Sequence, residues 1–587
     1  MVKQLMKSIR EFKLATILTP TFVIGEVIIE ALIPFLISLL INDIKAGCDL
    51  SVILGYAWKL VALSLLSLLC GYLAGIYCAK ASTGFARNLR YDIFTNIQKF
   101  SFSNIDKFSS ASLVTRLTTD IQNVQMAFMM IIRTAVRAPL NLIFSFTMAY
   151  IMGGTMAVIF LIIIPFLGIG LYLIVRSVMP IFKKGFPLFD KITRIVEENV
   201  KGIRVVKSFV REDFEINKFD ETSNDIRKMF TRAEQIIALN NPLMQISIYA
   251  VMLFVLMFGS EMIIKTNGTS LDVGQLSTLM TYGFQIMVSL MMLSMVFVMI
   301  TFSEESSKRI VEVLNEKSSI TSKENAITEV KDGSIDFDHV RFKYSPTAER
   351  PVLENIDVHI KSGETIGIIG GTGSAKSSFV QLIPRLYDVT EGTVRVGKED
   401  VRDYDLVTLR DSVAMVLQKN VLFSGTIADN IRWGNKDATL EEVKHVCHLA
   451  CADEFIEQMP DGYDTWIEQG GTNVSGGQKQ RLCIARALLK QPKILIMDDS
   501  TSAVDTKTDA IIRKAMREYI PETTKIIIAQ RTSSVEDADR IIVLDGGKID
   551  AIGTSEELLK TNQIYREVYL SQNKQGTEEI VEEGGVR

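Results

Sequence analysis

Long apolar stretches dominate the first half of the chain, whereas alternating apolar and polar positions begin only near residue 334. A membrane-spanning helix needs about 20 predominantly apolar residues, and six stretches reach that length. One of them, Met156–Val175, carries no charged residue, and Gly153–Gly154 before it predict a tight turn between two spans. The six expected spans lie near residues 14–42, 52–78, 127–152, 156–178, 236–264 and 274–301.

Basic residues beside the spans predict their orientation, because Lys and Arg concentrate in cytoplasmic connections. If the N-terminus is cytoplasmic, segments 1–13, 79–116 and 176–232 lie inside and together carry 23 Lys and Arg residues. The opposite connections contribute only two, Lys45 and Lys265. We therefore expect six crossings of the cell (inner or plasma) membrane, with both termini in the cytoplasm.

The two long inside connections keep a helical pattern and contain few residues that break helices. Since a helix rises 1.5 Å per residue, about 30 residues extend roughly 45 Å beyond a span. The sequence therefore predicts helices that continue into the cytoplasm and reverse near residues 101–112 and 210–219. Such long polar excursions need a surface to pack against, so we expect each tip to dock on a cytoplasmic domain. A solvated hairpin without a partner is the alternative.

Two pairs of like-charged residues stand one helical turn apart within the expected spans: Glu26 with Glu30, and Arg133 with Arg137. Charges at membrane depth are costly and face a cavity or one another. Cavity lining by the glutamates and snorkelling of the arginines both remain open. Methionine adapts to irregular shapes, so a Met-rich last span suits a promiscuous pocket as well as lipid-facing packing. These methionines are Met287, Met291, Met292, Met295 and Met299.

Composition narrows the class of protein. The 587 residues are 48% hydrophobic and 22% charged, which excludes a disordered chain and a small disulfide scaffold. Lys and Arg number 64 against 68 Asp and Glu, so no basic field indicates a nucleic-acid partner. Cys447, His448 and Cys451 lie close together but lack a second pair of ligands, and an ordinary helix face is favoured over a metal site.

The segment GETIGIIGGTGSAKSSFVQLI, residues 363–383, places a glycine-rich turn between an apolar strand and a helix start. That is the context of a phosphate-binding loop. Backbone N–H groups and the helix N-terminus attract phosphates, and Lys376 is positioned to reach the terminal phosphates while Ser377 holds Mg²⁺. The residues expected to bind ATP here are Gly370, Gly371, Thr372, Gly373, Ser374, Ala375, Lys376, Ser377 and Ser378.

Ala375 departs from the strict loop pattern, which has glycine before the lysine. A methyl group is tolerable in a right-handed conformation but crowds a position that needs positive φ. We expect nucleotide binding to survive in weakened form. About 120 residues downstream, the apolar run Ile494–Met497 precedes Asp498, and a buried strand ending in an acidic residue predicts a Mg²⁺ ligand in such ATPases.

With these motifs in place, the chain resembles the ATP-binding cassette (ABC) transporters, specifically exporter half-transporters, over nearly its whole length. The most specific mark is NVSGGQKQR, residues 473–481, which is similar to the family signature with valine in place of leucine. The resemblance implies that this segment completes the ATP site of a second subunit. The matching residues are Ser475, Gly476, Gly477 and Gln478.

Further residues take their expected roles from the same resemblance. VLQKN implies that Gln418 is the glutamine of the Q-loop and a further Mg²⁺ ligand, and FKYSP implies that Tyr344 stacks on adenine. SAVD, which ends at Asp505, resembles the loop that crosses to the second subunit. TWIEQGG resembles the exporter-specific loop that touches the membrane helices, with Glu468 at its acidic position.

The expected fold is an all-α six-helix transmembrane domain with long cytoplasmic helical extensions, fused to an α/β P-loop ATPase domain. By resemblance, two ATP domains meet head to tail, and their closure on ATP drives the membrane helices from inward-facing to outward-facing. The expected boundaries are 1–310 for the transmembrane domain, 311–332 for a linker, 333–572 for the ATP-binding cassette and 573–587 for a disordered tail.

Two catalytic positions depart from the family pattern. Asp499 stands where the family has the glutamate that polarises the attacking water, so its carboxylate is retracted by one methylene, roughly 1.5 Å. Misplacement of about 1 Å can cost about 100-fold in rate. Gln530 stands at the switch-histidine position and can hydrogen-bond a γ-phosphate but cannot carry charge.

Ala375, Asp499 and Gln530 fall in one nucleotide pocket, while the signature that serves the other pocket is intact. We therefore predict the degenerate half of a heterodimeric exporter, whose partner carries the consensus glutamate and histidine. The expected cofactors are ATP and Mg²⁺, and membrane lipid surrounds the transmembrane domain. The expected substrate is a hydrophobic or amphipathic compound, exported in multidrug efflux. The alternatives are a homodimeric exporter of lipid, peptide or drug, in which aspartate and glutamine hydrolyse adequately, and an ATP-gated regulatory subunit that does not hydrolyse.

Overall fold

The computed structural model describes residues 1–345, 347–500 and 504–572, apart from the side chains of residues 183, 186 and 190. The tail predicted at 573–587 lies outside the described residues.

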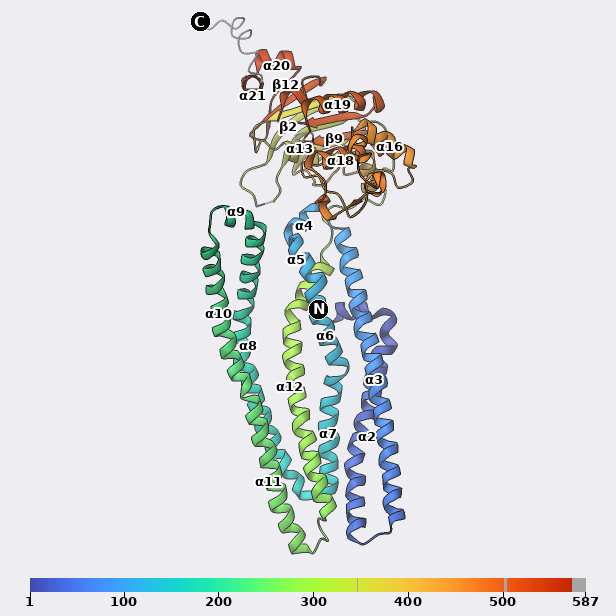
Figure 1. Ribbon diagram of the computed structural model, residues 1–587, viewed down its shortest axis with the longest axis vertical. Helices are drawn as coiled ribbons and strands as arrows, with labels where there is room; N and C mark the ends of the chain where they lie inside the picture. The colour runs from blue at the N-terminus through green and yellow to red at the C-terminus, as the bar shows by residue number, and fades with distance from the viewer. Residues whose placement is uncertain (346, 501–503, 573–587) are drawn as a thin grey trace. The chain divides into compact units, whose positions relative to one another are not determined.

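The chain forms two compact units (Figure 1). The first unit comprises Met1–Lys99 and Phe108–Glu316, and the second comprises Phe100–Lys107 together with the residues from Lys317 onward. The first is helical and the second is a mixed α/β structure, as the sequence predicts.

Long helices build the first unit, and each expected span lies in a helical run. At 1.5 Å per residue, the 49 residues of α3 reach about 74 Å, well beyond a membrane's hydrocarbon core. The helices are α1 (Val2–Leu5), η1 (Met6–Phe12), α2 (Lys13–Lys45), α3 (Leu50–Gln98), α5 (Ser110–Thr115), η2 (Arg116–Asp120), α6 (Ile121–Ile132), α7 (Thr134–Gly153), η3 (Gly154–Ala157), α8 (Val158–Lys201), α9 (Ile203–Ser208), α10 (Glu212–Ala238), α11 (Asn240–Thr266) and α12 (Val273–Asn315).

Among the described residues, five continuous helical runs are long and apolar enough to cross a membrane. One of them, Ser110–Lys201, holds two of the six expected spans, because the chain turns back between α7 and α8. Gly154 makes this turn with φ +53°, a conformation that favours glycine. The predicted hairpin at Gly153–Gly154 is therefore present, and the run contains a pair of antiparallel helices.

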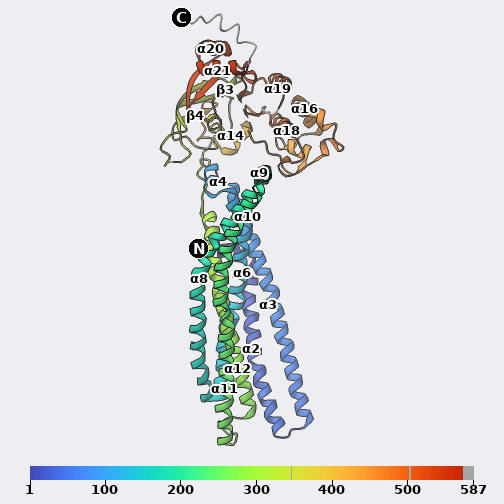
Figure 2. The same ribbon diagram turned by 60° about the vertical axis from the view of Figure 1, so that its left-hand side comes forward.

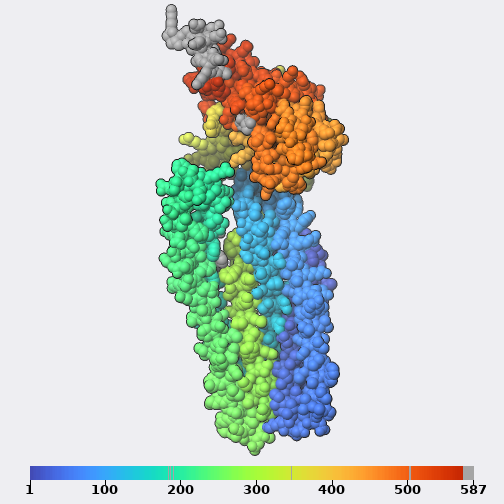
Figure 3. All heavy atoms as spheres, in the orientation of Figure 1, coloured from blue at the N-terminus to red at the C-terminus, as the bar shows by residue number. Residues whose placement is uncertain are grey.

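The second long connection forms a hairpin of α8 and α10, which pack side by side (Figures 1 and 2). Its reversal spans residues 202–211, a few residues before the predicted segment 210–219, most of which lies in α10. Acidic side chains fill the first turn of α10, where the helix dipole favours negative charge. Phe209 and Val210 at the turn are 72% and 80% exposed, and the hairpin's end stands clear of the other helices of the unit (Figure 3).

The first connection reverses near α4 (Phe102–Phe108), and residues 100–107 belong to the second unit. Within that unit, Tyr387 donates a hydrogen bond to Asp106 Oδ2 at 2.9 Å. The Phe102 ring lies against Tyr387 with ring centres 6.0 Å apart. An aromatic and a polar contact thus join this tip to the ATPase-like fold.

Two sheets organise the second unit. An antiparallel sheet has the order β2-β1-β4-β5, and a six-stranded sheet has the order β12-β11-β3-β10-β9-β6, parallel except for β12. The strands are β1 (Ile335–Phe342), β2 (Leu353–Ile360), β3 (Thr365–Gly370), β4 (Glu391–Val396), β5 (Glu399–Asp400), β6 (Val413–Val416), β7 (Gly425–Thr426), β8 (Trp466–Ile467), β9 (Ile494–Asp498), β10 (Thr524–Ile528), β11 (Arg540–Asp545) and β12 (Lys548–Gly553).

Helices surround these sheets and complete the apolar core. They are α13 (Lys376–Gln381), α14 (Leu406–Ser412), α15 (Ile427–Arg432), α16 (Leu440–Leu449), α17 (Asp453–Ile456), η4 (Gly462–Asp464), η5 (Gln469–Gly471), α18 (Gly476–Leu489), α19 (Thr506–Tyr519), η6 (Thr532–Ser534), α20 (Ser555–Thr561) and α21 (Gln563–Gln572).

The parallel strands explain where a site forms. Every residue of β9 and β10 is buried, which accounts for their continuous apolar runs. Because β3, β6, β9 and β10 are parallel, their carboxyl ends meet at one edge of the sheet. The segments leaving this edge contain the phosphate loop and the three residues Gln418, Asp499 and Gln530.

Candidate nucleotide site

The phosphate loop runs from the end of β3 to the start of α13. A Cβ on Gly370 would lie 2.1 Å from the Leu544 carbonyl oxygen, so this position requires glycine. A Cβ on Gly371 or Gly373 would meet nothing within 4 Å, and Gly373 has φ +84°. The backbone here is open to close approach, which fits a chain of phosphates.

Lys376 lies folded over this loop. Its Nζ donates to the Gly370 and Gly371 carbonyl oxygens at 2.8 and 2.9 Å. Burial lowers the pKa of Lys376, while the charges of Asp498 and Asp499 act in the opposite direction. A lysine that is bound to loop carbonyls and partly desolvated is well placed to turn toward an incoming phosphate.

Ala375 adopts the left-handed conformation, with φ +70° and ψ 22°. Of the right-handed and left-handed conformations that the sequence allows at this position, this is the unfavourable one. A left-handed non-glycine residue costs about 1–2 kcal/mol, because its Cβ crowds the following carbonyl oxygen. The loop therefore carries backbone strain at the position where the strict motif has glycine.

Two buried carboxylates follow the end of β9. Asp498 and Asp499 are 5% and 8% exposed, and burial raises the pKa of both. The Ser377 side chain hydrogen-bonds Asp498 and opposes that rise, whereas the neighbouring Asp499 charge adds to it. Ser377 and Asp498 are thus an oxygen pair that suits Mg²⁺, which would relieve the repulsion between the two carboxylates.

Two side-chain amides converge on one carboxylate oxygen of Asp499. Asp499 Oδ2 accepts a hydrogen bond from Gln530 Nε2 at 2.8 Å and from Gln418 Nε2 at 3.4 Å. Asp499 itself has φ +48°, a strained conformation for a residue with a side chain. Gln480 of α18 donates to the Asp499 carbonyl oxygen at 3.4 Å, a contact that no motif indicated.

The signature segment forms the N-terminus of α18. Ser475 Oγ accepts from the Gln478 backbone N–H at 3.3 Å, and Gln478 Oε1 accepts from the Ser475 backbone N–H at 2.8 Å. This reciprocal capping box leaves Ser475 and Gly476 exposed. An exposed, capped helix start next to two glycines can accept an anion from another molecule.

The other motif residues lie around this site or beyond the described part of it. The Tyr344 hydroxyl is 2.8 Å from Ser378 Oγ, and its ring stands edge-on to Tyr387, with ring centres 5.0 Å apart. Asp505 caps α19 by accepting from the Thr508 N–H at 3.0 Å. Residues 502 and 503 of the same loop lie outside the described residues.

Cys447, His448 and Cys451 lie in and just after α16. Cys447 is fully buried, and burial raises the pKa of its thiol to about 12. His448 Nδ1 lies 2.5 Å from Asp453 Oδ2. Cys447 and His448 thus lie on a helix face as predicted, whereas Cys451 lies beyond the end of α16 with φ +54°.

In the first unit, the glutamate pair of the spans shares one partner from the arginine pair. Arg137 donates to Glu26 Oε1 at 3.0 Å and to Glu30 Oε1 at 2.7 Å. One arginine of α7 therefore joins two turns of α2, and this accounts for three of the four charges. Arg133 lies at the break between α6 and α7 and is half-buried.

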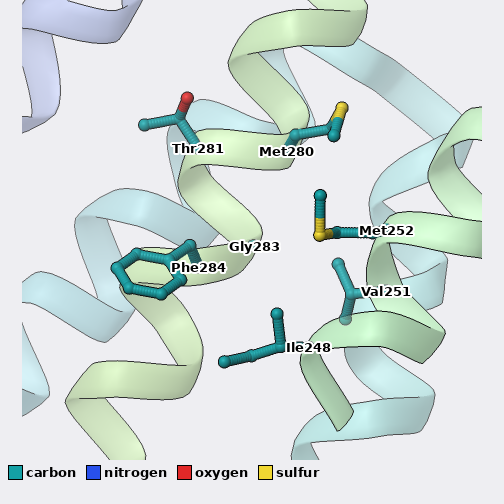
Figure 4. A pocket seen from close by; sticks show the side chains of 7 residues that line it. All are labelled: Ile248, Val251, Met252, Met280, Thr281, Gly283 and Phe284. Atoms are coloured by element: carbon teal, nitrogen blue, oxygen red, sulfur yellow. The ribbon is translucent and has the colours of Figure 1, made fainter. Parts of the chain in front are cut away.

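Two hollows of the first unit involve the last span. A cavity of about 410 Å³ lies among α8, the end of α10, the start of α11, and α12. Its lining includes Met291, Met292 and Met295, together with Asn240 and Ser294. A second hollow of about 320 Å³ lies between α11 and α12, where Met252 and Met280 face each other above Ile248 and Phe284 (Figure 4). Neither described lining contains a charged side chain.

Comparison with known proteins agrees with this geometry. Residues 16–311 match the family described as ABC transporter transmembrane region, and residues 353–502 match the family described as ABC transporter. A relative in Bacillus subtilis (strain 168), the uncharacterized ABC transporter ATP-binding protein YfiB, is 34% identical over 94% of this chain and 96% of its own length. The ATP-dependent lipid A-core flippase of Desulfotalea psychrophila is 31% identical over 85% of this chain and 87% of its own.

A solved structure shares the fold. The structure of a bacterial Atm1-family ABC exporter with ATP bound superposes with a TM-score of 0.82 and covers 96% of this chain and 98% of that one, at 24% identity. The expected fold class is therefore confirmed: a helical membrane domain with long helices, fused to a nucleotide-binding domain.

Proposed function

The chain belongs to the ABC transporters, and on that premise we propose that it is the subunit of a heterodimeric exporter whose own ATP site hydrolyses slowly. Its partner is a second half-transporter with glutamate and histidine at the positions of Asp499 and Gln530. ATP and Mg²⁺ are the cofactors, and the multi-pass chain places both termini in the cytoplasm.

The convergence of two side-chain amides on Asp499 Oδ2 carries this proposal. A general base must accept a hydrogen bond from the water that it activates. The shorter aspartate is held back by about one methylene, and its Oδ2 already accepts from Gln530 and Gln418. A glutamine also supplies no positive charge as negative charge develops on the γ-phosphate. The site therefore suits binding better than turnover.

Binding at this site uses residues that remain intact. Lys376 supplies the positive charge for the terminal phosphates, and Ser377 with Asp498 would hold Mg²⁺ and thereby orient the β- and γ-phosphates. Tyr344 offers its ring to the adenine. ATP then stays bound through many cycles, and the interface around it remains closed.

The signature supports a role for this chain in the partner's site. The capping box holds the start of α18 in a fixed conformation, with Ser475 and Gly476 exposed. That arrangement presents backbone N–H groups to the ATP held by the partner's phosphate loop. One chain therefore combines a slow site of its own with a competent half-site for its partner.

The α8–α10 hairpin supports assembly with a second chain. Its turn exposes Phe209 and Val210, and a neighbouring groove of about 350 Å³ is lined by Val200, Ile203 and Ile216 among others. Apolar side chains at the end of a polar hairpin favour a covered position. We propose that this tip docks on the ATPase domain of the partner.

Co-expression tests the assembly. A neighbouring gene for a half-transporter with the consensus glutamate and histidine would supply the partner to co-express. The co-purified pair should hydrolyse ATP at least tenfold faster than this chain alone. Equal turnover by the single chain would favour a homodimeric exporter. Conformational change on ATP without substrate flux in the pair would favour a regulatory subunit.

The linings of the membrane cavities favour an uncharged hydrophobic compound as the transported substrate, or the apolar part of an amphipathic one. Their described linings are apolar and Met-rich, with Asn240 and Ser294 as polar groups in the larger cavity. Glu26 and Glu30, which would attract a lipophilic cation, are paired with Arg137. Transport by the pair in vesicles, compared between a neutral dye, a lipophilic cation and a labelled lipid, tests this preference. The lipid arm is included because one relative is a lipid A-core flippase.

A further inference from the structure

The last described residue of the second unit, Gln572, contacts the segment that follows β10. Its Oε1 accepts from the Thr532 backbone N–H at 2.9 Å and from the Thr532 hydroxyl at 3.2 Å. Its Nε2 donates to the Gln530 carbonyl oxygen at 2.8 Å. One side-chain amide thus satisfies a carbonyl and an N–H on either side of Arg531, as a neighbouring strand would.

A fixed helix holds this amide in place. Tyr565 of α21 is fully buried, in a core cluster with Ile369 and Val535. Its hydroxyl lies 2.8 Å from Ser555 Oγ, and its backbone N–H donates to Asn562 Oδ1 at 2.8 Å. The position of Gln572 is therefore set by the packing of α21 against the sheet that carries the nucleotide site.

The contact reaches the site through Gln530. Gln572 fixes the backbone of Gln530, whose side chain donates to Asp499 Oδ2 at 2.8 Å. Thr532, on the other side of Arg531, is 1% exposed, and the only acceptor of its N–H among the described residues is Gln572 Oε1. The conformation of the segment 530–532 thus depends on a residue 40 positions further along the chain.

We propose that Gln572 is a positioning residue for the segment 530–532: it holds Gln530 where its amide can contact the γ-phosphate, and so sets the preference of this site for ATP over ADP. The proposal rests on the proposed function only in placing a γ-phosphate beside Gln530. It does not require slow hydrolysis or a heterodimer. The β-phosphate and adenine contacts, made by the phosphate loop and Tyr344, do not depend on Gln572.

Binding of two nucleotides to the full-length chain tests the proposal. The probes are AMP-PNP, which retains a γ-phosphate and is not hydrolysed, and ADP, each with Mg²⁺. Gln572→Ala should weaken AMP-PNP binding by about fivefold, the effect of losing one ordinary hydrogen bond, and leave ADP binding unchanged. Gln530→Ala should show the same selective loss, and the double variant should lose no more than either single one.

Two further variants keep the result interpretable. Gln563→Ala removes a side chain at the start of the same helix, where Gln563 Nε2 donates only to Glu567 Oε1 in the described structure, and it should leave both affinities unchanged. Gln572→Glu keeps an acceptor for the Thr532 N–H but loses the donor to Gln530, so it should reproduce part of the selective loss. If either Gln572 variant weakens both nucleotides equally, Gln572 merely supports the fold and the proposal is overturned. Unchanged AMP-PNP binding, or additive losses in the double variant, would overturn it as well.

Because AMP-PNP and ADP are bound without turnover, this test is independent of the ATPase comparison. A single chain that hydrolysed ATP rapidly would contradict the proposed heterodimer and leave the role of Gln572 standing. A Gln572→Ala variant with an unchanged ratio of AMP-PNP to ADP affinity would contradict the role of Gln572 and leave the proposed heterodimer standing.

Discussion

Gln530 and Asp499 are joined by a hydrogen bond of 2.8 Å from Nε2 to Oδ2, across the carboxyl ends of the adjacent parallel strands β10 and β9. Register explains this proximity, because Ile528 pairs with Asp498 and the next residues of both strands leave the sheet together. The two positions that depart from the family pattern are therefore one structural feature. A change at either residue alters the surroundings of the other, so their effects on hydrolysis should be coupled.

Replacing Ala375 with glycine should strengthen nucleotide binding. Ala375 has φ +70°, and glycine adopts this conformation without the Cβ clash. A gain of about 1 kcal/mol, or about fivefold in ATP affinity, is expected. Titration of the full-length chain with a fluorescent ATP analogue measures it. Gly373→Ala, which introduces a side chain at φ +84°, is the matched opposite and should weaken binding. Equal affinities for all three proteins would show that the loop strain has no role.

Replacing Ser475 with alanine should impair the partner's site more than this chain's own. The substitution removes the cap of α18 and costs about 1 kcal/mol of helix stability. Thr439→Ala is the matched control, since Thr439 caps α16 with the same kind of box, Glu442 being its partner. In the co-purified pair, Ser475→Ala should lower turnover at least tenfold, and Thr439→Ala should leave turnover near wild type. Similar losses in both would reduce Ser475 to a stabilising role.

Replacing Arg137 with methionine should destabilise the first unit. It leaves Glu26 and Glu30 without their shared partner. Removing one member of a fully buried ion pair costs roughly 3–5 kcal/mol, which is the upper bound for this partly exposed cluster. Thermal unfolding in detergent should show a clearly lowered midpoint. The triple variant that also carries Glu26→Gln and Glu30→Gln should recover most of the loss, because no uncompensated charge remains. A triple variant as unstable as the single one would show that Arg137 acts through packing.

Much of the fold was predictable from local patterns. Apolar runs of spanning length indicated the helices of the first unit, and Gly153–Gly154 indicated the turn between α7 and α8. The second hairpin turns earlier than predicted, because the acidic residues from Glu212 onward begin α10 and do not form a loop. Periodicity alone cannot distinguish a polar helix start from a polar turn.

The positions of the site residues were predictable where a sequence motif identifies them. The phosphate loop, Asp498 and the cap of α18 lie where their spacing indicates. The left-handed conformation of Ala375 was not predictable, because the sequence is compatible with a right-handed or a left-handed backbone at this position. The contacts of Gln480, Gln572 and Tyr387 had no sequence signal, since each depends on tertiary packing between distant segments.

Phosphate release by the purified single chain, measured in the wild type and in an Asp499→Glu/Gln530→His variant, distinguishes a slow nucleotide site from a competent one. Restoring the longer carboxylate and the histidine should raise turnover by about 100-fold over a slow wild type, the scale that a misplacement of about 1 Å implies. The same variant carrying Asp498→Asn should stay inactive, because it lacks the proposed Mg²⁺ ligand. A wild-type chain that already hydrolyses ATP rapidly, with no gain from the two substitutions, would contradict the account.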